Sequence, residues 1–352
     1  MKTAVVIGAL GVMGRYIVER LAELPDWQVV GLSRRRGEDR ERVSYLPVDL
    51  LDPVAAGAKL GGLSGATHVF YCAFQPAAGA AADFAKNITA NRDMLVNSVS
   101  AIEAAAPELE RVVLVTGTKY YGSHLGPFRT PAREEDPRHL GPNYYFDQID
   151  WLTGFQRGKR WSWAELRPQT LCGFAPGTAM SIVPVIAVYA AISKELGLPL
   201  CFPGTPENYR AVYQCTGAEQ LAKAIAWMST EPRCANQAFN ITNGDYIRWC
   251  NLWPKFAAYF DMPLGPVRTV RLADVMADKA PVWQRIVEKY DLRPVPFESV
   301  ALWPYGDFLF TPHWDVMSST TKARQYGFAD LVDTEALFIE LLDHYRKERV
   351  LP

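Results

Sequence analysis

Two segments of the chain carry tyrosine and lysine side chains that could polarise a carbonyl group. An ammonium beside a phenol favours the phenolate and so lowers the pKa of the phenol. Many reductases place this lysine four residues after the tyrosine, on one helix face. No tyrosine here has a lysine at that offset. The candidate groups lie instead in 116–121, which contains Lys119, and in 143–150, which contains Tyr144 and Tyr145.

Three glycines near the amino terminus predict a loop that binds a dinucleotide. Gly8, Gly11 and Gly14 follow a short apolar run and open an expected helix, which is the context this motif requires. Gly8 permits the tight turn, Gly11 lets the backbone approach a pyrophosphate, and Gly14 lets the helix pack closely on the strand. Val12 and Met13 begin the helix, whose N–H groups and positive dipole end would face the anion.

The end of the second expected strand predicts which dinucleotide binds. An NAD-preferring site has an acidic residue there, which accepts hydrogen bonds from the ribose 2′-hydroxyl. This chain has Ser33, Arg34, Arg35 and Arg36 instead. Guanidinium groups bind a 2′-phosphate through charge-assisted hydrogen bonds, whereas a carboxylate would repel it. We therefore expect NADPH, although a solvated basic turn is the alternative interpretation.

Three further residues at strand ends are expected to contact the cofactor. Asp49 follows the third expected strand and could accept a hydrogen bond from the adenine amino group. Its alternative role is to cap the next helix. Thr116 and Gly117 follow the fifth expected strand.

Alternating strand and helix patterns predict the elements that position these residues. In the first half, short β-rich apolar runs alternate with longer helical patterns, which is typical of parallel strands joined by crossover helices. The expected fold is therefore α/β, a doubly wound parallel sheet of the Rossmann type. Its strands are expected at 4–7, 27–32, 43–48, 68–72, 111–115 and 162–166, and its helices at 12–24, 83–105 and 145–157.

The alternation weakens in the second half of the chain. We expect an NADP-binding domain over 1–172 and a smaller, mostly helical substrate-binding part over 173–352. Helices are expected at 182–195 and 218–228, and a strand near 237–241 returns to the sheet. The stretch 248–305 is apolar and aromatic without a clear period. Large apolar side chains are expected to line the substrate site, namely Phe174, Met180, Trp303 and Phe308.

Composition excludes several other classes of protein. The chain has 352 residues, a formal net charge of -1, 49% hydrophobic and 21% charged residues. A charge near zero does not favour nucleic acid or anionic membranes, and no segment approaches the roughly 20 apolar residues of a membrane span. We expect a soluble, cytoplasmic protein that could form a homodimer. Its cysteines are expected to be reduced and mostly buried. No metal site is expected, because the six cysteines and five histidines have no ligand spacing.

Several sequence blocks in the same order resemble one family. The segments 116–121 and 143–150 resemble two signature motifs of the progesterone 5β-reductase and iridoid synthase-like family, an atypical branch of the short-chain dehydrogenases. The resemblance covers nearly the whole chain, through 67–71, 167–168, 173–174, 188–192, 202–204, 238–240, 252–253 and 325–328. Ordered blocks are more specific than any one motif.

The resemblance implies an activity and two catalytic residues. By this resemblance, Lys119 matches the family's functional lysine and Tyr145 its catalytic tyrosine. The family reduces the C=C bond of enones and enals with NADPH. Hydride goes to the β-carbon while the tyrosine hydroxyl stabilises the enolate oxygen. We therefore expect a small apolar enone or enal as substrate.

The chain also departs from the family's pattern. The family usually has Asn-Phe-Tyr-Tyr followed by a Glu-Asp pair, whereas this chain has Asn-Tyr-Tyr-Phe and then Ile149 and Asp150. Tyr120 stands where the family commonly has histidine. Tyr144 is consequently a rival for the catalytic role, and Lys119 could support the tyrosine or bind the nicotinamide ribose.

Three other functions remain open from the sequence alone. A nucleotide-sugar epimerase or dehydratase shares the extended Rossmann architecture but normally has the lysine four residues after its tyrosine. A carbonyl reductase would reduce the C=O bond instead. A non-catalytic NADP-sensing protein would keep the glycine loop and lack the catalytic acid.

Overall fold

A parallel seven-stranded sheet forms the centre of the N-terminal half of the molecule. The computed structural model describes residues 1–76, 84–177 and 180–352. All strand pairs in this sheet are parallel, in the order β3-β2-β1-β4-β5-β6-β10, which confirms the expected Rossmann-type α/β fold. The strands are β1 Lys2–Ile7, β2 Trp27–Ser33, β3 Val43–Pro47, β4 His68–Tyr71, β5 Arg111–Val115, β6 Ser162–Pro168 and β10 Gln237–Ile241.

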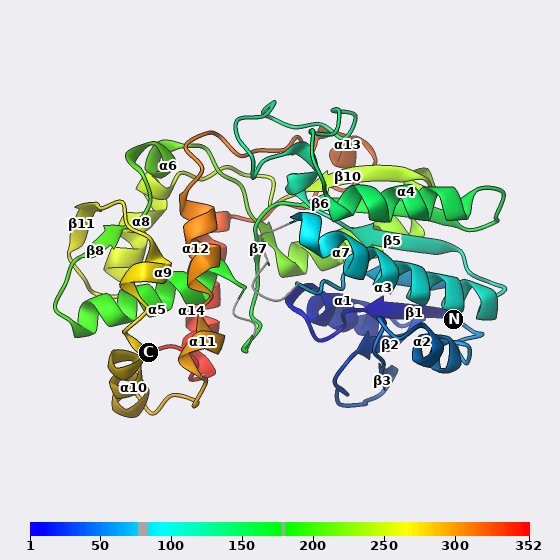
Figure 1. The fold of residues 1–352 in the computed structure, drawn as a ribbon, viewed down its shortest axis with the longest axis horizontal. Helices are drawn as coiled ribbons and strands as arrows, with labels where there is room; N and C mark the ends of the chain where they lie inside the picture. Colours follow the sequence, from blue (N-terminus) through cyan, green and yellow to red (C-terminus); the bar gives the residue numbers. More distant parts are fainter. Residues whose placement is uncertain (77–83, 178–179) are drawn as a thin grey trace.

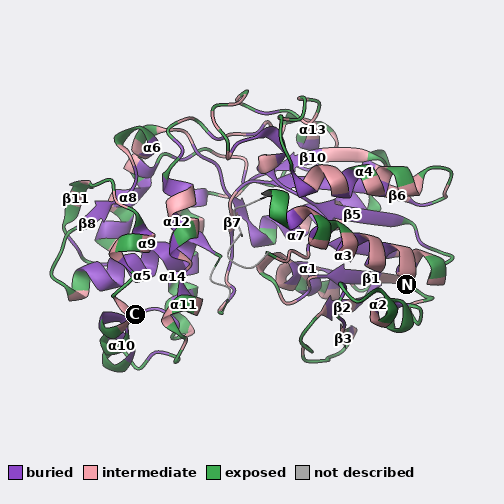
Figure 2. Cartoon of the chain, in the orientation of Figure 1, coloured by how far each residue is buried: buried purple, intermediate pink, exposed green. Residues whose placement is uncertain are grey.

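Helices cover both faces of the sheet, so its central strands are buried (Figures 1 and 2). Successive strand side chains point to opposite faces. Accordingly Ala4 and Val6 pack in one apolar cluster, whereas Val5 and Ile7 pack in another. The first cluster includes side chains of α1 (Val12–Glu23) and α7 (Ala218–Thr230), and the second includes side chains of α2 (Pro53–Leu60), α3 (Phe84–Ala105) and α4 (Tyr144–Gln156).

The strand order reverses at β1, which lies between β2 and β4. The chain runs from β1 through β2 to β3 on one side, then crosses to β4 on the other. Such a switch point leaves a crevice at the carboxyl ends of the strands, where ligands bind in open α/β sheets. The glycine loop follows β1 at this point.

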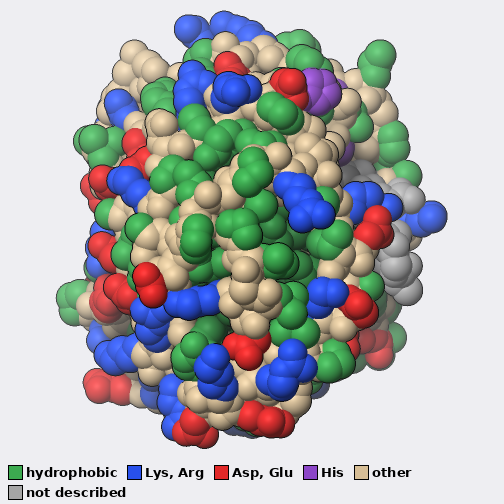
Figure 3. Space-filling model, turned by 90° about the vertical axis from the view of Figure 1, so that its left-hand side faces the viewer, with side chains coloured by type: hydrophobic (Ala, Val, Ile, Leu, Met, Phe, Trp, Pro, Cys, Tyr) green, Lys and Arg blue, Asp and Glu red, His purple; other side chains and the backbone are tan. Residues whose placement is uncertain are grey.

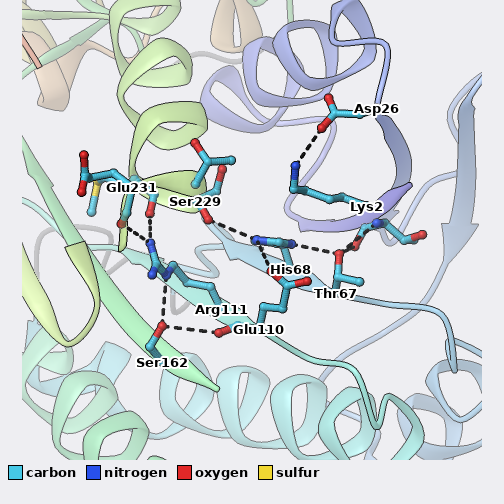
Figure 4. Close-up of polar contacts among 12 residues, drawn as sticks. Lys2, Asp26, Thr67, His68, Glu110, Arg111, Ser162, Ser229 and Glu231 are labelled. Carbon is cyan, nitrogen blue, oxygen red and sulfur yellow. Dashed lines mark hydrogen bonds and ion pairs between the residues drawn. The ribbon is translucent and has the colours of Figure 1, made fainter. Parts of the chain in front are cut away.

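A polar network holds the amino ends of two central strands, β4 and β5, against α7 (Figure 4). The Arg111 guanidinium donates to the carbonyl oxygens of Met228 and Glu231, at and just beyond the last turn of α7, and its Nε donates to Ser162 Oγ at 3.1 Å. Cations stabilise the carbonyl end of a helix. His68 Nε2 lies 3.2 Å from the Ser229 carbonyl oxygen. Arg111 and His68 thus join β4 and β5 to α7 far from the carboxyl edge.

The C-terminal part has its own aromatic core, which surrounds the buried helix α5 (Ile182–Glu195). Trp249, Trp253 and Phe256 of α8 pack there with Phe338 of α14. The other elements of this half are β7 Leu171–Cys172, β8 Leu200–Phe202, α6 Pro206–Arg210, β9 Thr216–Gly217, η2 Pro232–Cys234, α8 Trp249–Tyr259, β11 Leu264–Val267, α9 Leu272–Val275, α10 Ala280–Lys289, α11 Phe297–Val300, α12 Trp303–Phe310, α13 Thr321–Gln325 and α14 Thr334–Lys347.

Most expected elements of the first half agree with the structure to within one or two residues. The α4 helix begins at Tyr144 because Asn143 caps it. The expected start of α3 at residue 83 lies outside the described residues. The stretch 248–305 showed no clear period, yet it contains α8, α10, three shorter elements and the start of α12. In α10 the buried residues recur at helical spacing, namely Val282, Trp283, Ile286 and Val287, so the sequence interpretation missed a period that this part of the chain contains.

The surface of the C-terminal part carries a central group of hydrophobic side chains surrounded by charged ones (Figure 3). Exposed leucines of this part include Leu196, Leu198 and Leu264. The expected homodimer stays a prediction.

All six cysteines are free and five are buried, as expected. None of the helices in the described part of the chain combines the length and apolar character that crossing a bilayer requires.

Candidate active site

The glycine loop forms a tight turn between β1 and α1. Gly8 has a φ of +91°, and a Cβ there would lie 2.9 Å from the Ala73 backbone nitrogen. A Cβ on Gly14 would lie 2.6 Å from the Cα of Ala9, so only glycine lets α1 approach the strand end. Gly11 begins α1 as an N-cap without a side-chain hydrogen bond. The first N–H groups of the helix are therefore left for an anion.

A cavity of about 660 Å³ extends from this loop along the ends of β1 and β2. Ser33, Arg34, Arg35 and Asp49 line it, together with Gly8, Gly11, Val12 and Met13. Within the described part of the chain, Arg34 and Arg35 form no ion pair, whereas the third arginine of this turn is paired with Asp39. Two exposed arginines therefore line the cavity without an ion pair in the described part of the chain.

Asp49 does not cap the following helix. Its carboxylate accepts from the Leu51 N–H at 3.0 Å. Asp52 is the cap of α2, because its Oδ1 accepts from the N–H groups of Val54 and Ala55. The alternative role of Asp49 as a helix cap is thus wrong. Asp49 lies on the cavity wall, and its contact with the adenine amino group stays a prediction.

A second cavity, of about 230 Å³, lies at the carboxyl ends of β5 and β6. Both cavities are lined by Val12, Met13, Phe74 and Met180, so they meet. Residues from two distant segments line the second one, namely Thr116, Gly117, Thr118, Lys119, Tyr144 and Tyr145. The structure thus brings the expected lysine and both candidate tyrosines to one cavity beside the expected cofactor groove.

Tyr144 and Tyr145 have different surroundings in this cavity. Tyr145 points toward the end of β5, where a Cβ added to Gly117 would lie 3.3 Å from its hydroxyl oxygen. Tyr144 is buried and stacks on Phe74 with 5.4 Å between ring centroids. Burial raises the pKa of both phenols. The hydrogen bond between them lowers the pKa of Tyr145 and raises the pKa of Tyr144. Both are neutral at pH 7 and can donate hydrogen bonds.

Lys119 brings a positive charge to a mostly apolar wall. Its ammonium lies 4.3 Å from the centroid of the Phe308 ring, a cation–π contact. Burial lowers the pKa of Lys119 to about 8, because an ammonium is poorly solvated there. At pH 7 this lysine is still mainly protonated.

Asn143 connects the two segments that carry Lys119 and Tyr145. Its side-chain oxygen accepts from the Tyr145 N–H at 3.0 Å and so caps α4. Its side-chain nitrogen donates to the Lys119 carbonyl oxygen at 3.0 Å. Asn143 itself is buried, with 1% of its surface exposed. One amide therefore sets the relative position of the segment carrying Lys119 and the helix carrying Tyr145.

A buried ion pair supports the end of β5. Glu165 and Arg167 of β6 lie 2.7 Å apart and are almost fully buried. The Thr116 hydroxyl donates to Glu165 at 2.7 Å, and Arg167 donates to the Tyr121 hydroxyl at 3.0 Å. Each charge has a partner, as buried charges require. The network holds both ends of 116–121 against β6.

Two of the four residues expected on the substrate wall line the second cavity, and two do not. Met180 and Phe308 line it. Phe174 stacks on His344 instead, at 3.9 Å between centroids, and Trp303 is buried against Phe297. Aromatic residues have no sequence signal that separates cavity walls from core. The sequence interpretation also missed several lining residues, namely Phe74, Gln169, Thr170, Tyr213 and Tyr305.

The parallel sheet and the glycine loop at its switch point define a Rossmann-type α/β fold, which solved structures share. The Bordetella bronchiseptica enzyme WbmH, solved in complex with NAD+, superposes with a TM-score of 0.68 at 16% identity, over 99% of each chain. The UDP-glucose 4-epimerase of Thermotoga maritima superposes with a TM-score of 0.68 at 15% identity, over 98% of this chain and 99% of that one. Identities this low show a shared fold alone.

Sequence comparison identifies the family. Residues 53–352 match the PRISE-like Rossmann-fold domain, so the chain belongs to the PRISE-like Rossmann-fold family, as expected. The short chain dehydrogenase gsfE of Penicillium aethiopicum is 33% identical over 100% of this chain and 99% of its own. The 3-oxo-Delta(4,5)-steroid 5-beta-reductase of Arabidopsis thaliana is 31% identical over 99% and 93%, and the (S)-8-oxocitronellyl enol synthase of Catharanthus roseus 30% over 99% and 92%.

Proposed function

We propose that the protein is an NADPH-dependent oxidoreductase that reduces the C=C bond of a small α,β-unsaturated ketone or aldehyde. One observation carries the proposal: Tyr145 and Lys119, 26 positions apart in the sequence, line one small cavity that meets the groove of the glycine loop. A hydrogen-bond donor and a positive charge beside such a groove fit a carbonyl oxygen that becomes negative during the reaction.

The names of two relatives describe this chemistry. In a 3-oxo-Δ4,5-steroid the carbonyl group is conjugated with a C=C bond, and C5 is the β-carbon of that system. An enol synthase makes the species expected when hydride adds to the β-carbon of an enal and a proton adds to its oxygen. Both names therefore fit hydride addition to the β-carbon of a conjugated carbonyl.

The residues of the larger cavity fit NADPH. The N–H groups at the start of α1 would bind the pyrophosphate, and Gly8, Gly11 and Gly14 leave room for it. Arg34 and Arg35 would bind the 2′-phosphate, and Asp49 the adenine amino group. When bound, NADPH supplies the hydride. The small second cavity, below the roughly 300–1,000 Å³ of typical drug-sized sites, favours a small substrate.

Each residue of the small cavity has a proposed role in the reaction. The neutral phenol of Tyr145 donates a hydrogen bond to the substrate carbonyl and stabilises its growing negative charge. Tyr144 supports this donor through the hydrogen bond between the two phenols. The Lys119 ammonium adds positive charge to the cavity. Apolar side chains such as Met180 and Phe308 exclude water, which strengthens these interactions.

An absorbance assay tests the proposal. NADPH consumption is followed with 2-cyclohexenone, with cyclohexanone and with no substrate, and the product is identified by mass spectrometry. We expect consumption with the enone alone and cyclohexanone as the product. Turnover of cyclohexanone would instead identify a carbonyl reductase, and no turnover across a range of enones and enals would favour an NADP-sensing protein.

An epimerase is the less favoured function, although solved epimerases share the fold. The positions four residues after Tyr144 and Tyr145 hold Gln148 and Ile149. Gln148 is buried and donates to the Asn91 carbonyl oxygen at 3.0 Å, and Ile149 packs in the core. Neither can replace the lysine that such an epimerase uses.

A further inference from the structure

Lys119 places a primary amine in the small cavity. Its Nζ lies 4.3 Å from the centroid of the Phe308 ring, and both residues line the cavity. The side chain is only partly buried, so some of its surface is accessible from the cavity. A small molecule that enters the cavity therefore meets the amine as well as the phenol of Tyr145.

The surroundings of this amine favour its neutral form, which is the form that acts as a nucleophile. Apolar side chains such as Met180, Leu309 and Val316 line the same cavity. Burial lowers the pKa of Lys119 to about 8, so roughly a tenth of the amine is neutral at pH 7. At the ordinary value of 10.5, fewer than about one amine in a thousand would be neutral. A lysine desolvated in this way is activated for attack on carbonyl compounds.

The other nucleophilic side chains of the two cavities are weaker. Cys72 lines the larger cavity but is 7% exposed, and its thiol donates to the Ile7 carbonyl oxygen at 3.1 Å. Burial raises the pKa of Cys72 to about 12, so its reactive thiolate is scarce at neutral pH. Among the described residues, no cysteine lines the small cavity. Lys119 is consequently the strongest nucleophile that a bound carbonyl compound meets.

Lys322 separates the effect of the cavity from that of burial. Burial lowers the pKa of Lys322 as well. Its ammonium donates to the Gln237 side-chain oxygen at 2.8 Å and to the Ala238 carbonyl oxygen at 3.0 Å, and Lys322 lines neither cavity. Both lysines are thus partly desolvated, but only Lys119 has room beside it for a ligand.

We infer that Lys119 is a covalent binding site for small apolar aldehydes, with which it forms an imine in the small cavity. The inference rests on one part of the proposed function, the entry of a conjugated aldehyde whose oxygen binds Tyr145. The amine nitrogen attacks the carbonyl carbon, so a C–N bond forms as the C=O bond is broken. The oxygen leaves as water with the two protons of the amine, and a C=N bond remains. The step needs no oxidant or reductant.

The imine has a consequence for activity. The small cavity measures about 230 Å³, so an aldehyde held on Lys119 excludes a second substrate molecule from Tyr145. Water reverses the reaction and restores the amine. Aldehyde that accumulates without NADPH therefore keeps part of the enzyme inactive until the imine hydrolyses.

Reductive trapping tests the inference. The full chain is incubated without NADPH with (E)-2-hexenal and sodium cyanoborohydride, which reduces an imine to a stable secondary amine. Peptide mass spectrometry then identifies the labelled lysines. We expect Lys119 to be labelled at least about tenfold faster than the exposed Lys347, because more of its amine is neutral and the cavity binds the aldehyde. Lys322 is the internal control and should be labelled no faster than Lys347.

Lys119→Arg is the matched variant, since it keeps a positive charge in the cavity but cannot form an imine. Its intact mass should lack the rapidly formed adduct, and a melting curve will verify that it is folded. Labelling of Lys119 no faster than that of Lys347, or equally fast labelling of Lys322, would overturn the inference.

A separate assay follows NADPH consumption with hexenal and with other enals and enones. Reduction of hexenal without rapid labelling of Lys119 would refute the inference and leave the proposed function intact. Rapid labelling of Lys119 with no reduction of any enal or enone would refute the proposed function and support the inference.

Discussion

Two neighbouring phenols, Tyr144 and Tyr145, have the same chemistry but different contacts, and their substitution should separate their roles. We predict that Tyr145→Phe lowers kcat by about 100-fold or more, the usual effect of losing a positioned donor to a developing oxyanion. Tyr144→Phe removes a supporting hydrogen bond and should cost about tenfold or less. Steady-state rates with 2-cyclohexenone measure both. The reverse ranking would assign the donor role to Tyr144.

The burial of Lys119 should be visible in the pH dependence of stability. Its folded pKa of about 8 lies below the ordinary value of 10.5, so the unfolded chain binds more protons between these pH values. The free energy of unfolding therefore rises with pH across that window, relative to a variant without the ammonium. Urea unfolding of the cofactor-free wild type and Lys119→Met at pH 7.5, 8.5 and 9.5 checks this.

Lys347→Met, on an exposed position of α14, is the control for this measurement. The stability difference between wild type and Lys119→Met should grow in favour of the wild type as the pH rises. The difference between wild type and Lys347→Met should stay constant. A flat difference for Lys119→Met as well would mean that solvent reaches the Lys119 ammonium.

At the scale of the element, the first turn of α4 depends on one buried amide. Asn143→Ala removes the cap of the helix and the contact with Lys119. We expect a loss of about 1–2 kcal/mol in the free energy of unfolding and a fall in kcat, because the segments that carry Lys119 and Tyr145 shift. Asp333→Ala removes the cap of α14 and should lower stability with kcat unchanged. A normal kcat in Asn143→Ala would show that other contacts suffice to position Tyr145.

At the scale of the whole molecule, the two halves of the chain contribute to one continuous site, since Met180 lines both cavities. NADPH should therefore stabilise the entire fold, by about 2.7 kcal/mol at 100 times its Kd. We predict a larger rise in Tm with NADPH than with NADH at equal concentration. The Arg34→Ala, Arg35→Ala double variant should lose that difference and keep the NADH response.

Arg36→Ala is the control for the cofactor preference, because Arg36 already pairs with Asp39 at 2.6 Å. This variant should retain the larger NADPH response. Equal responses of the wild type to the two cofactors would contradict the proposed role of Arg34 and Arg35. They would favour the alternative interpretation, in which these arginines form a solvated basic turn.

The sheet, the glycine loop and the family can be predicted from the sequence alone. Strand period, buried apolar runs such as Arg111–Val115 and the spacing of Gly8, Gly11 and Gly14 are local properties, so each can be recognised without knowing its neighbours in space. The two segments with Lys119 and Tyr145 could be found as well, because their motifs resemble those of the family. Their approach to each other was implied by that resemblance alone, because the contact that fixes it, Asn143 linking η1 (Thr118–Tyr121) to α4, has no sequence signal.

The aromatic side chains that face the small cavity, by contrast, can be recognised only in the folded chain. Trp303 and Tyr305 are two residues apart on α12, yet Trp303 packs in the core and Tyr305 lines the site. The same holds for the arginines after β2, where Asp39 pairs with Arg36, and Arg34 and Arg35 form no ion pair in the described part of the chain. Burial and pairing are set by neighbours that lie far away along the chain or across a turn, and residue type alone does not encode those neighbours.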